Sequence, residues 1–242
     1  MMSIIYSVVI PLKNEDKNIP DLLQELEPVM NKIGNWELIC IDDGSTDRTR
    51  HVLEELSKSR PYLKILLFKK NYGQSSAFDA GFRAAKGEYV ITLDGDGQND
   101  PADIPKLIGA LNGNDLVCGI RLHRKDTWAK RIISKAANAL RNCLCEDGVQ
   151  DSGCSLKIYR ASCLKKIKMY NGMHRFLPAL FKIEGFRVHQ LPVNHRERLR
   201  GKSNYNIFNR SLNTLADLWA VRWMKKRQLT YQIIPASPKT GH

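Results

Sequence analysis

Short apolar runs alternate with longer segments of helical periodicity over the first 120 residues. The apolar runs are bounded by turn-forming residues and predict strands at Tyr6–Ile10, Trp36–Ile41, Leu63–Phe68, Tyr89–Leu93 and Leu116–Gly119. The periodic segments predict helices at Ile19–Ile33, Thr46–Lys58, Ser75–Lys86 and Pro101–Leu111. This alternation predicts an α/β fold, a mostly parallel sheet with helices on both faces.

The second half of the chain follows a looser pattern. We expect a basic helical segment at Arg121–Arg141, a pair of strands within Ile183–Val193 and a final helix at about Asn206–Arg227. Apolar residues of that last helix recur at intervals of three and four, the spacing of one helix face: Phe208, Leu212, Leu215, Trp219 and Trp223. Its C-terminal end is basic, and the tail beyond Leu229 is expected to be poorly ordered. The pattern predicts one large domain over 1–205, with halves 1–120 and 121–205, and an amphipathic helix with a flexible tail over 206–242.

Polar clusters follow three of the predicted strands, at Pro11–Glu15, Asp42–Asp47 and Asp94–Gln98. Because ligands of such sheets bind beyond the carboxyl ends of the strands, the three clusters predict one cleft. Asp94 and Asp96 stand one residue apart, an arrangement that suits Mg²⁺ bridging to phosphate oxygens. An ordinary acidic turn explains this stretch equally well on its own. No P-loop and no GxGxxG motif occurs, so carboxylates and a metal would have to hold a nucleotide.

The charge of the chain is unevenly distributed. The total is +13, but residues 1–120 carry 13 basic and 18 acidic residues, a net −5, while residues 121–242 carry 25 and 7, a net +18. A basic half of this kind fits a nucleic acid, a phosphorylated substrate or an anionic membrane surface.

The cysteines and the apolar segments exclude several classes of protein. Six cysteines without CxxC spacing favour a reduced, cytosolic setting, and a zinc site from Cys143 and Cys145 lacks further spaced ligands. No apolar stretch approaches the roughly 18 residues of a membrane-spanning helix, and the N-terminus lacks the pattern of a secretory signal.

Five motifs stand in order along the chain: Ser7–Glu15, Ile41–Asp47, Asn71–Gln74, Leu93–Gln98 with Pro101, and His195–Tyr205. On these motifs the chain resembles the family 2 inverting glycosyltransferases, and within them the dolichyl- and polyprenyl-phosphate sugar transferases, over nearly its whole length. The resemblance implies a GT-A type, Rossmann-like nucleotide-diphosphosugar transferase fold. It also implies Mg²⁺ or Mn²⁺ as cofactor and attack on the anomeric carbon with inversion.

By this resemblance, residues of the first half would bind the nucleotide-sugar donor: Pro11, Asn14, Glu15, Asp42, Asp43, Gln74 and Asp94. Asp94, Asp96 and Gln98 would coordinate the metal, with Asp96 a catalytic residue, so that charge on the departing diphosphate is neutralised. An alternative for Asp42 and Asp43 is an Asx turn, in which Ser45 or Thr46 caps the next helix.

The resemblance places groups that bind the diphosphate or an acceptor phosphate in the basic half: Arg121, Arg131, Ser152, Arg198, Lys202 and Ser203. Arg198, Lys202 and Ser203 surround Gly201 and would fold over the diphosphate as a lid. Family members often have Lys where this chain has Asn204, so the lid lacks one cation. A solvated charge run is the alternative for this segment.

Asp151 has two candidate roles under the resemblance. It would be the catalytic base if the acceptor were a hydroxyl group. A polyprenyl phosphate is already ionised near neutral pH and needs no base, so Asp151 would then organise an acceptor pocket in which Arg121 and Arg131 bind the phosphate.

We therefore expect a metal-dependent inverting glycosyltransferase that moves a sugar from a UDP- or GDP-sugar to polyprenyl (undecaprenyl or dolichyl) phosphate at the cytoplasmic membrane face. One alternative is transfer to a sugar hydroxyl in lipopolysaccharide or surface polysaccharide synthesis, with Asp151 as base. A nucleic-acid-binding module is disfavoured, because aromatic residues are not interleaved with the basic ones as a stacking platform requires. The last helix suits an anionic membrane surface or packs against the domain, so we expect a peripheral cytoplasmic protein without a transmembrane helix.

Overall fold

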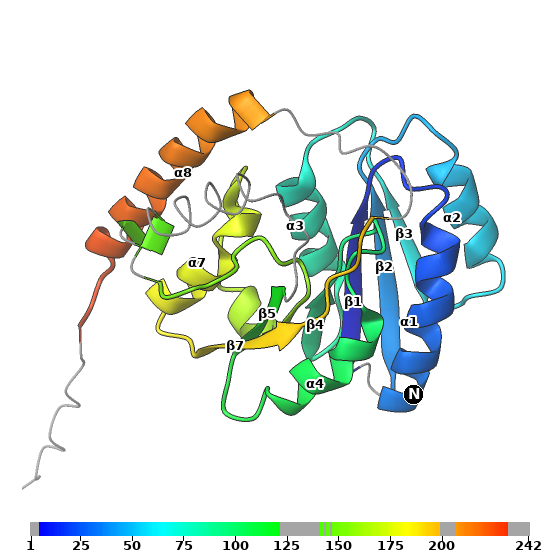
Figure 1. Ribbon diagram of the computed structural model, residues 1–242, viewed down its shortest axis with the longest axis horizontal. Coiled ribbons are helices and arrows are strands. Elements are labelled where there is room, and N and C mark those ends of the chain that lie inside the picture. Colours follow the sequence, from blue (N-terminus) through cyan, green and yellow to red (C-terminus); the bar gives the residue numbers. More distant parts are fainter. Residues whose placement is uncertain (1–4, 122–140, 143, 146, 199–206, 232–242) are drawn as a thin grey trace, which may run out of the picture.

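A seven-stranded sheet forms the centre of the protein (Figure 1). The computed structural model describes residues 5–121, 141–142, 144–145, 147–198 and 207–231. The strands are β1 (Tyr6–Leu12), β2 (Trp36–Asp42), β3 (Leu63–Leu67), β4 (Tyr89–Thr92), β5 (Leu116–Arg121), β6 (Lys157–Arg160) and β7 (Val188–Val193). Their order is β3-β2-β1-β4-β6-β5-β7, and only β6 runs antiparallel to its neighbours within these described strands. The predicted α/β fold with a mostly parallel sheet is confirmed.

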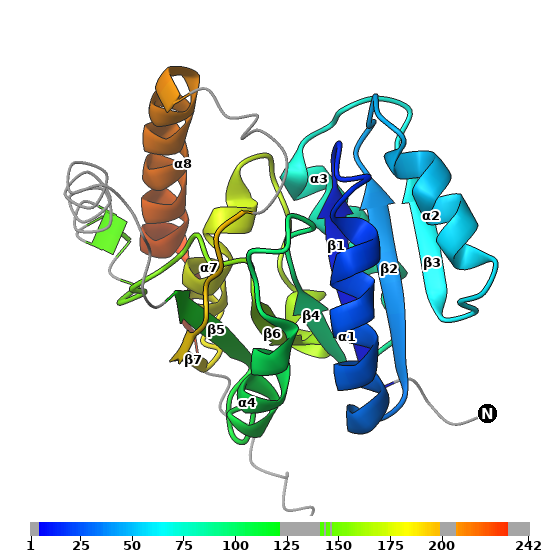
Figure 2. The same cartoon turned by 45° about the vertical axis from the view of Figure 1, so that its right-hand side comes forward.

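Helices cover both faces of this sheet (Figures 1 and 2). One face carries α1 (Ile19–Ile33), α2 (Thr49–Ser57) and α4 (Ile104–Gly109); the other carries α3 (Gln74–Ala84), α6 (Ala161–Leu164) and α7 (Leu177–Ile183). Alternate side chains of a strand point to opposite faces, so Val8 and Ile10 pack with α1 while Val9 packs with α3. The continuous burial of β2 follows from apolar packing on both of its sides.

Several predicted boundaries change in the structure. Helix α2 begins at Thr49 and not at Thr46, because the Asp47 carboxylate accepts a hydrogen bond from the Thr49 N–H at 2.9 Å. Ser45 and Thr46 therefore do not cap it. A 3₁₀ turn, η1 (Pro101–Asp103), precedes α4, and a second, η2 (Met173–Arg175), precedes α7.

The strand pair predicted within Ile183–Val193 is wrong. Ile183 ends α7, and the positive φ of Gly185 turns the chain away from the helix. Only β7 follows, and its partner is β5, more than 60 residues earlier. Strand β6 and helix α7 were not predicted, and the segment predicted as a helix at Arg121–Arg141 lies almost entirely outside the described residues.

Helix α8 (Ile207–Arg227) stands beside α7, on the side of the molecule away from α1 and α2 (Figure 2). It packs on the domain through Leu218 and Val221, which are buried with residues of α7 and η2. The side chains of Leu215, Trp219 and Trp223, three of the five predicted apolar positions, are exposed instead. The helix therefore packs through a different face from the apolar stripe that the sequence predicts. The side chains of Phe208 and Leu212, the other two predicted positions, are not among those that the structure describes. Within the described chain, no helix combines the length and apolar character needed to cross a bilayer.

Candidate active site

A cleft of about 790 Å³ opens at the carboxyl ends of β1, β4 and β5, where the predicted polar clusters lie. Ten predicted site residues line it: Pro11, Glu15, Asp43, Gln74, Asp94, Asp96, Gln98, Arg121, Ser152 and Arg198. Three other described residues of the predicted site are not part of this lining: Asn14, Asp42 and Asp151. Arg131, Lys202 and Ser203 lie outside the described residues.

The loop after β2 fixes its two carboxylates with backbone hydrogen bonds. Asp42 Oδ1 accepts from the Ser45 N–H at 3.0 Å, a bond that spans three residues, whereas that of the expected Asx turn spans two. Asp43 Oδ1 accepts from the Tyr72 N–H at 2.7 Å, and its Oδ2 accepts from the Gly73 N–H at 2.9 Å. Burial raises the pKa of Asp43, and these two hydrogen bonds oppose the shift. Asp43 therefore shapes the turn that leads into α3, while also bordering the cleft.

Asn14 ties the loop after β1 to the loop after β2. Its backbone is left-handed, with φ of 58°, a conformation that Asn tolerates better than most residues. Its N–H donates to Ser45 Oγ at 2.9 Å, and its Oδ1 accepts from the Thr46 N–H at 2.8 Å. Asn14 thus aligns the two loops without bordering the cleft itself.

The loop after β4 brings Asp94 and Asp96 to the cleft. Gln74 Nε2 donates to Asp94 Oδ1 at 2.9 Å, and Asn99 Oδ1 accepts from the Asp94 N–H at 3.1 Å. Gly95 packs directly on the Leu12 side chain, so no larger residue fits between the two carboxylates. The loop is therefore held from both sides, by α3 and by β1.

The Asp94 carboxyl is destabilised in its ionised form. Burial, followed by repulsion from Asp96, raises the pKa of Asp94 from 3.8 to about 6, against the opposing charges of Lys157 and Arg121. Asp96 Oδ1 accepts a local hydrogen bond from the Gln98 N–H at 3.1 Å. Two repelling carboxylates at a cleft wall are the arrangement that a bound cation relieves.

The donor set fits a divalent metal that is shared with a substrate. In the described part of the chain, no three His, Cys, Asp or Glu side chains come together as a complete ligand set. Mg²⁺ typically takes one or two protein carboxylates and fills its other positions with phosphate oxygens and water. The Gln98 side-chain amide donates to the Arg196 backbone O at 3.3 Å, which leaves its carbonyl oxygen as the group able to face a cation.

The segment that follows β7 is fastened to the Asp94–Gln98 loop. The Arg196 N–H donates to the Gln98 backbone O at 2.9 Å, and its guanidinium pairs with Asp100 at 2.8 Å. Arg198 pairs with Glu15, which also accepts from Asn18 Nδ2 at 2.5 Å. Burial raises the pKa of Glu15, while Asn18 and Arg198 oppose that shift. Arg198, the first residue of the predicted lid, is therefore held at the cleft wall by Glu15.

Arg121 and Asp151 form a nearly buried, bidentate ion pair. Arg121 Nε and Nη2 donate to the two Asp151 carboxylate oxygens, each at 2.7 Å, and the Arg121 N–H donates to Oδ2 at 3.2 Å. Burial opposes the charge on Asp151, but the hydrogen bonds and charge of Arg121 outweigh it and lower the pKa of Asp151. A Cβ on Gly153 would lie 2.9 Å from Arg121 Nη2, so a larger residue there would displace the guanidinium from this position. Arg121 borders the cleft, and Asp151 stands behind it.

The structure adds lining residues that the sequence did not reveal. Lys157 is 4% exposed, lies on β6 and donates through Nζ to the backbone O of Cys154. His174 of η2 shares a 2.6 Å hydrogen bond through Nδ1 with Ser75 Oγ at the start of α3, and Arg175 follows it in the lining. Both elements were missed because a four-residue strand and a single 3₁₀ turn leave little periodic signal.

Comparison with known proteins agrees with this geometry. The family model for glycosyl transferase family 2 matches residues 7–168. A dodecaprenyl-phosphate galacturonate synthase of Rhizobium johnstonii is 36% identical over 233 residues, which cover 93% of this chain and 69% of that protein. Glucosyl-3-phosphoglycerate synthase of Mycobacterium tuberculosis, in complex with Mn²⁺ and UDP-glucose, has a TM-score of 0.69 at 20% identity, over 90% of this chain and 79% of that one. Its UDP complex has a TM-score of 0.70 at 19% identity, over 90% and 80%. These structural likenesses show a common GT-A type fold.

Proposed function

We propose that this chain, which belongs to glycosyl transferase family 2, moves a sugar from a nucleotide-diphosphosugar to the phosphate of a polyprenyl lipid. The chain is a glycosyltransferase, and the further proposal concerns its donor, metal and acceptor. The observation that carries the choice of acceptor is the Arg121–Asp151 pair. In this pair the Arg121 guanidinium borders the cleft, whereas Asp151, the residue expected as the catalytic base, does not.

On the donor side, Asp94 and Asp96 would hold Mg²⁺ or Mn²⁺ together with the donor diphosphate. When bound, the metal neutralises the negative charge that develops on the departing nucleotide diphosphate. Gln74 keeps the Asp94 carboxylate oriented toward the cleft through its 2.9 Å hydrogen bond. Asp43 and the turn it holds, together with Pro11 and Glu15, would contact the nucleoside on the neighbouring wall.

On the acceptor side, the chemistry favours a group that is already ionised. Asp151 has a lowered pKa, accepts two hydrogen bonds from the Arg121 guanidinium and does not border the cleft, so it is a poor acceptor for a hydroxyl proton. A phosphate monoester needs no such proton transfer. Arg121, with Ser152 and Lys157 beside it in the lining, offers the cationic and polar groups that bind phosphate.

The 36% identity to a dodecaprenyl-phosphate galacturonate synthase supports a long-chain polyprenyl phosphate as the acceptor. The name of that relative makes galacturonate the first sugar to test as the donor group. Because such a lipid resides in a membrane, we also propose that the enzyme works as a peripheral protein on the cytoplasmic membrane face.

The test is a transfer assay with the full chain, a UDP- or GDP-linked sugar as donor and dodecaprenyl phosphate in detergent micelles as acceptor. Each reaction is run with and without Mn²⁺ or Mg²⁺. We expect a lipid-linked sugar only with metal, and none from the Asp96→Asn variant. Parallel reactions contain soluble oligosaccharides in place of the lipid. Glycosylated oligosaccharide without lipid-linked product would overturn the proposed acceptor and restore the hydroxyl alternative.

A further inference from the structure

An exposed apolar stripe runs along the outer face of α8. Leu215, Trp219 and Trp223 are spaced by four residues and are 41%, 62% and 63% exposed. The same helix buries Leu218 and Val221 against the domain, so the stripe is not needed to hold the helix in place. Two tryptophans that remain mostly exposed on one helix face indicate an interaction surface.

Cations flank the stripe at the C-terminal end of the helix. Lys226 and Arg227 are exposed, and the chain continues past them with exposed Leu229 and Tyr231. Aromatic residues with neighbouring Lys and Arg are typical of segments that lie in the interface of a bilayer, where rings enter the headgroup region and cations attract anionic lipids. The stripe and these cations together are called the α8 outer face below.

Helix α8 contacts two residues of the cleft wall. Arg175 Nη1 donates to Thr214 Oγ1 at 2.9 Å, and Asp217 contacts Gly172 so closely that a Cβ there would collide with its carboxylate. Arg175 and Gly172 both line the cleft. A surface bound by the α8 outer face would therefore be separated from this wall by the width of α8.

We propose that the α8 outer face docks the enzyme on an anionic bilayer. This inference rests on the proposed function, because docking on a bilayer would bring the cleft to the lipid that carries the acceptor phosphate. A second copy of the chain is the weaker occupant, because the one carboxylate in the sequence of α8, Asp217, lies against Gly172 and gives the terminal cations no acidic partner across a helix–helix contact. An anionic leaflet complements these cations instead.

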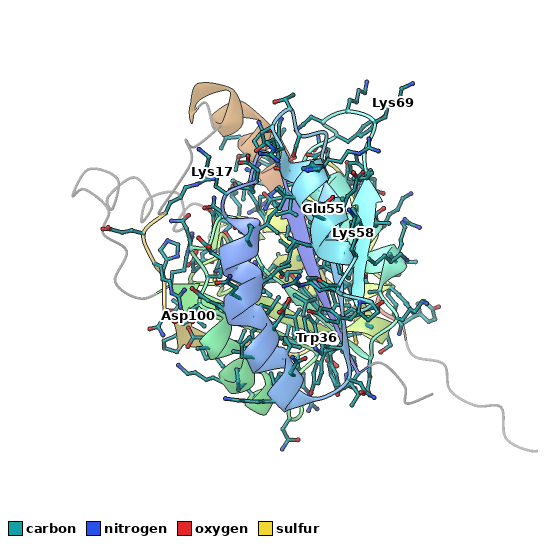
Figure 3. The ribbon with its side chains drawn as sticks, turned by 90° about the vertical axis from the view of Figure 1, so that its right-hand side faces the viewer. Lys17, Trp36, Glu55, Lys58, Lys69 and Asp100 are labelled. Atoms are coloured by element: carbon teal, nitrogen blue, oxygen red, sulfur yellow. The ribbon has the colours of Figure 1, made fainter. Side chains whose placement is uncertain are left out.

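The experiment measures binding of the full chain to sucrose-loaded vesicles by sedimentation, with no donor, metal or acceptor present. Vesicles contain phosphatidylcholine alone or with phosphatidylglycerol. The variants are Trp219→Ser with Trp223→Ser, and Lys226→Glu with Arg227→Glu. The control for the tryptophan variant is Leu67→Ser, which changes another exposed apolar residue. The control for the charge reversal is Lys58→Glu with Lys69→Glu. Lys58 and Lys69 lie on the side of the molecule that faces the viewer in Figure 3, with α8 behind.

We expect the double tryptophan variant to lose at least tenfold in vesicle partitioning, which corresponds to about 1.4 kcal/mol. The charge reversals should lower binding to phosphatidylglycerol vesicles by a similar factor and leave binding to pure phosphatidylcholine nearly unchanged. The two controls should bind like the unmodified chain.

Two results would overturn this docking surface. One is unchanged vesicle binding by both α8 variants. The other is a change of oligomeric state: the unmodified chain sediments as a dimer in analytical ultracentrifugation, the tryptophan variant sediments as a monomer, and the two bind vesicles equally. Because no substrate is present, either result is independent of whether lipid phosphate is the acceptor. Transfer to a short-chain, water-soluble prenyl phosphate by the tryptophan variant should match the unmodified chain.

Discussion

The Arg121–Asp151 pair gives a quantitative prediction about both stability and catalysis. The perturbations are Asp151→Asn, Arg121→Met and the double variant. Asn keeps the shape of the side chain but removes the charge, and Met keeps the aliphatic length of Arg without its donors. Together the three variants form a double-mutant cycle for the pair.

The expected magnitude follows from the burial and geometry of the pair. The two side chains are 17% and 11% exposed, and both N–O distances are 2.7 Å. Breaking a buried pair from one side costs about 3–5 kcal/mol. Because Arg121 still borders the cleft, where water can reach its charge, we expect a loss just below that range for Asp151→Asn, about 2–3 kcal/mol. The coupling energy from the cycle should be about 1–3 kcal/mol.

The loss should depend on pH in a definite direction. Because the folded protein lowers the pKa of Asp151, its contribution is present above 3.8, the ordinary value of the unfolded chain, and is lost as the pH falls through the folded pKa. The difference between the unmodified chain and Asp151→Asn should therefore be constant from about pH 5 to 8 and shrink below about pH 4.

Urea unfolding followed by tryptophan fluorescence measures the stability, and lipid-linked product formation measures the activity. If Asp151 positions Arg121, Asp151→Asn should raise the KM for the acceptor more than it lowers kcat, with the acidic limb of the pH–rate profile unchanged. A coupling energy below about 0.5 kcal/mol would refute the pairing argument. A 10²- to 10⁴-fold loss of kcat, with loss of the acidic limb, would identify Asp151 as a general base.

Four further variants test the loop after β2 and the carboxylate site. Gly44→Ala should lower the free energy of unfolding by at least about 2 kcal/mol, because φ is +67° and the new Cβ would lie 2.6 Å from the Asn71 backbone N. Gly185→Ala should lower it by only about 1 kcal/mol, because φ is +78° but the space around the new Cβ is open. Equal losses for the two variants in urea unfolding would contradict this reasoning. The folded pKa of Asp94 is raised to about 6, so without metal its ionisation should reduce stability as the pH rises from about 4 to 6. Asp94→Asn should remove that dependence and stabilise the metal-free protein at pH 8; an unchanged pH profile in EDTA would show that the carboxyl is not strained. Lys157→Met should raise the pH needed for half-maximal Mn²⁺ binding, because the Lys157 charge favours ionised Asp94, and an unshifted titration would contradict that role.

The position of the cleft could be predicted from the sequence because it depends on sheet geometry alone. Three polar clusters follow apolar runs, and parallel strands bring their carboxyl ends to one edge. The pattern therefore predicts Asp94 and Asp96 on the cleft wall, where the structure has them, whereas Gln74 is expected at the donor site only through the family resemblance. The alternating pattern carries this information locally.

The acceptor side could not be predicted to the same depth. Arg121 and Asp151 are 30 residues apart, and their bidentate contact depends on where the chain returns to form β6, a strand of only four residues. Lys157 stands on that same strand and was missed with it. Hydrophobic periodicity is a local signal and does not predict contacts between residues that are far apart in the sequence.

Helix α8 illustrates a second limit. Its periodicity predicted a stripe, but Leu218 and Val221 give the helix apolar residues on another face as well. Only the tertiary contacts with α7 and η2 decide which face is buried. The choice between packing and exposure was therefore open in the sequence and is resolved by the fold.

The central claim is that the acceptor is an ionised phosphate that needs no base from the protein. The most direct measurement offers the enzyme, donor and metal either dodecaprenyl phosphate or dodecaprenol, the same lipid with a hydroxyl group in place of the phosphate. Mass spectrometry of the extracted lipids then identifies the product. We predict a sugar attached to the phosphate lipid and no product from the alcohol, whereas glycosylated dodecaprenol would contradict the claim.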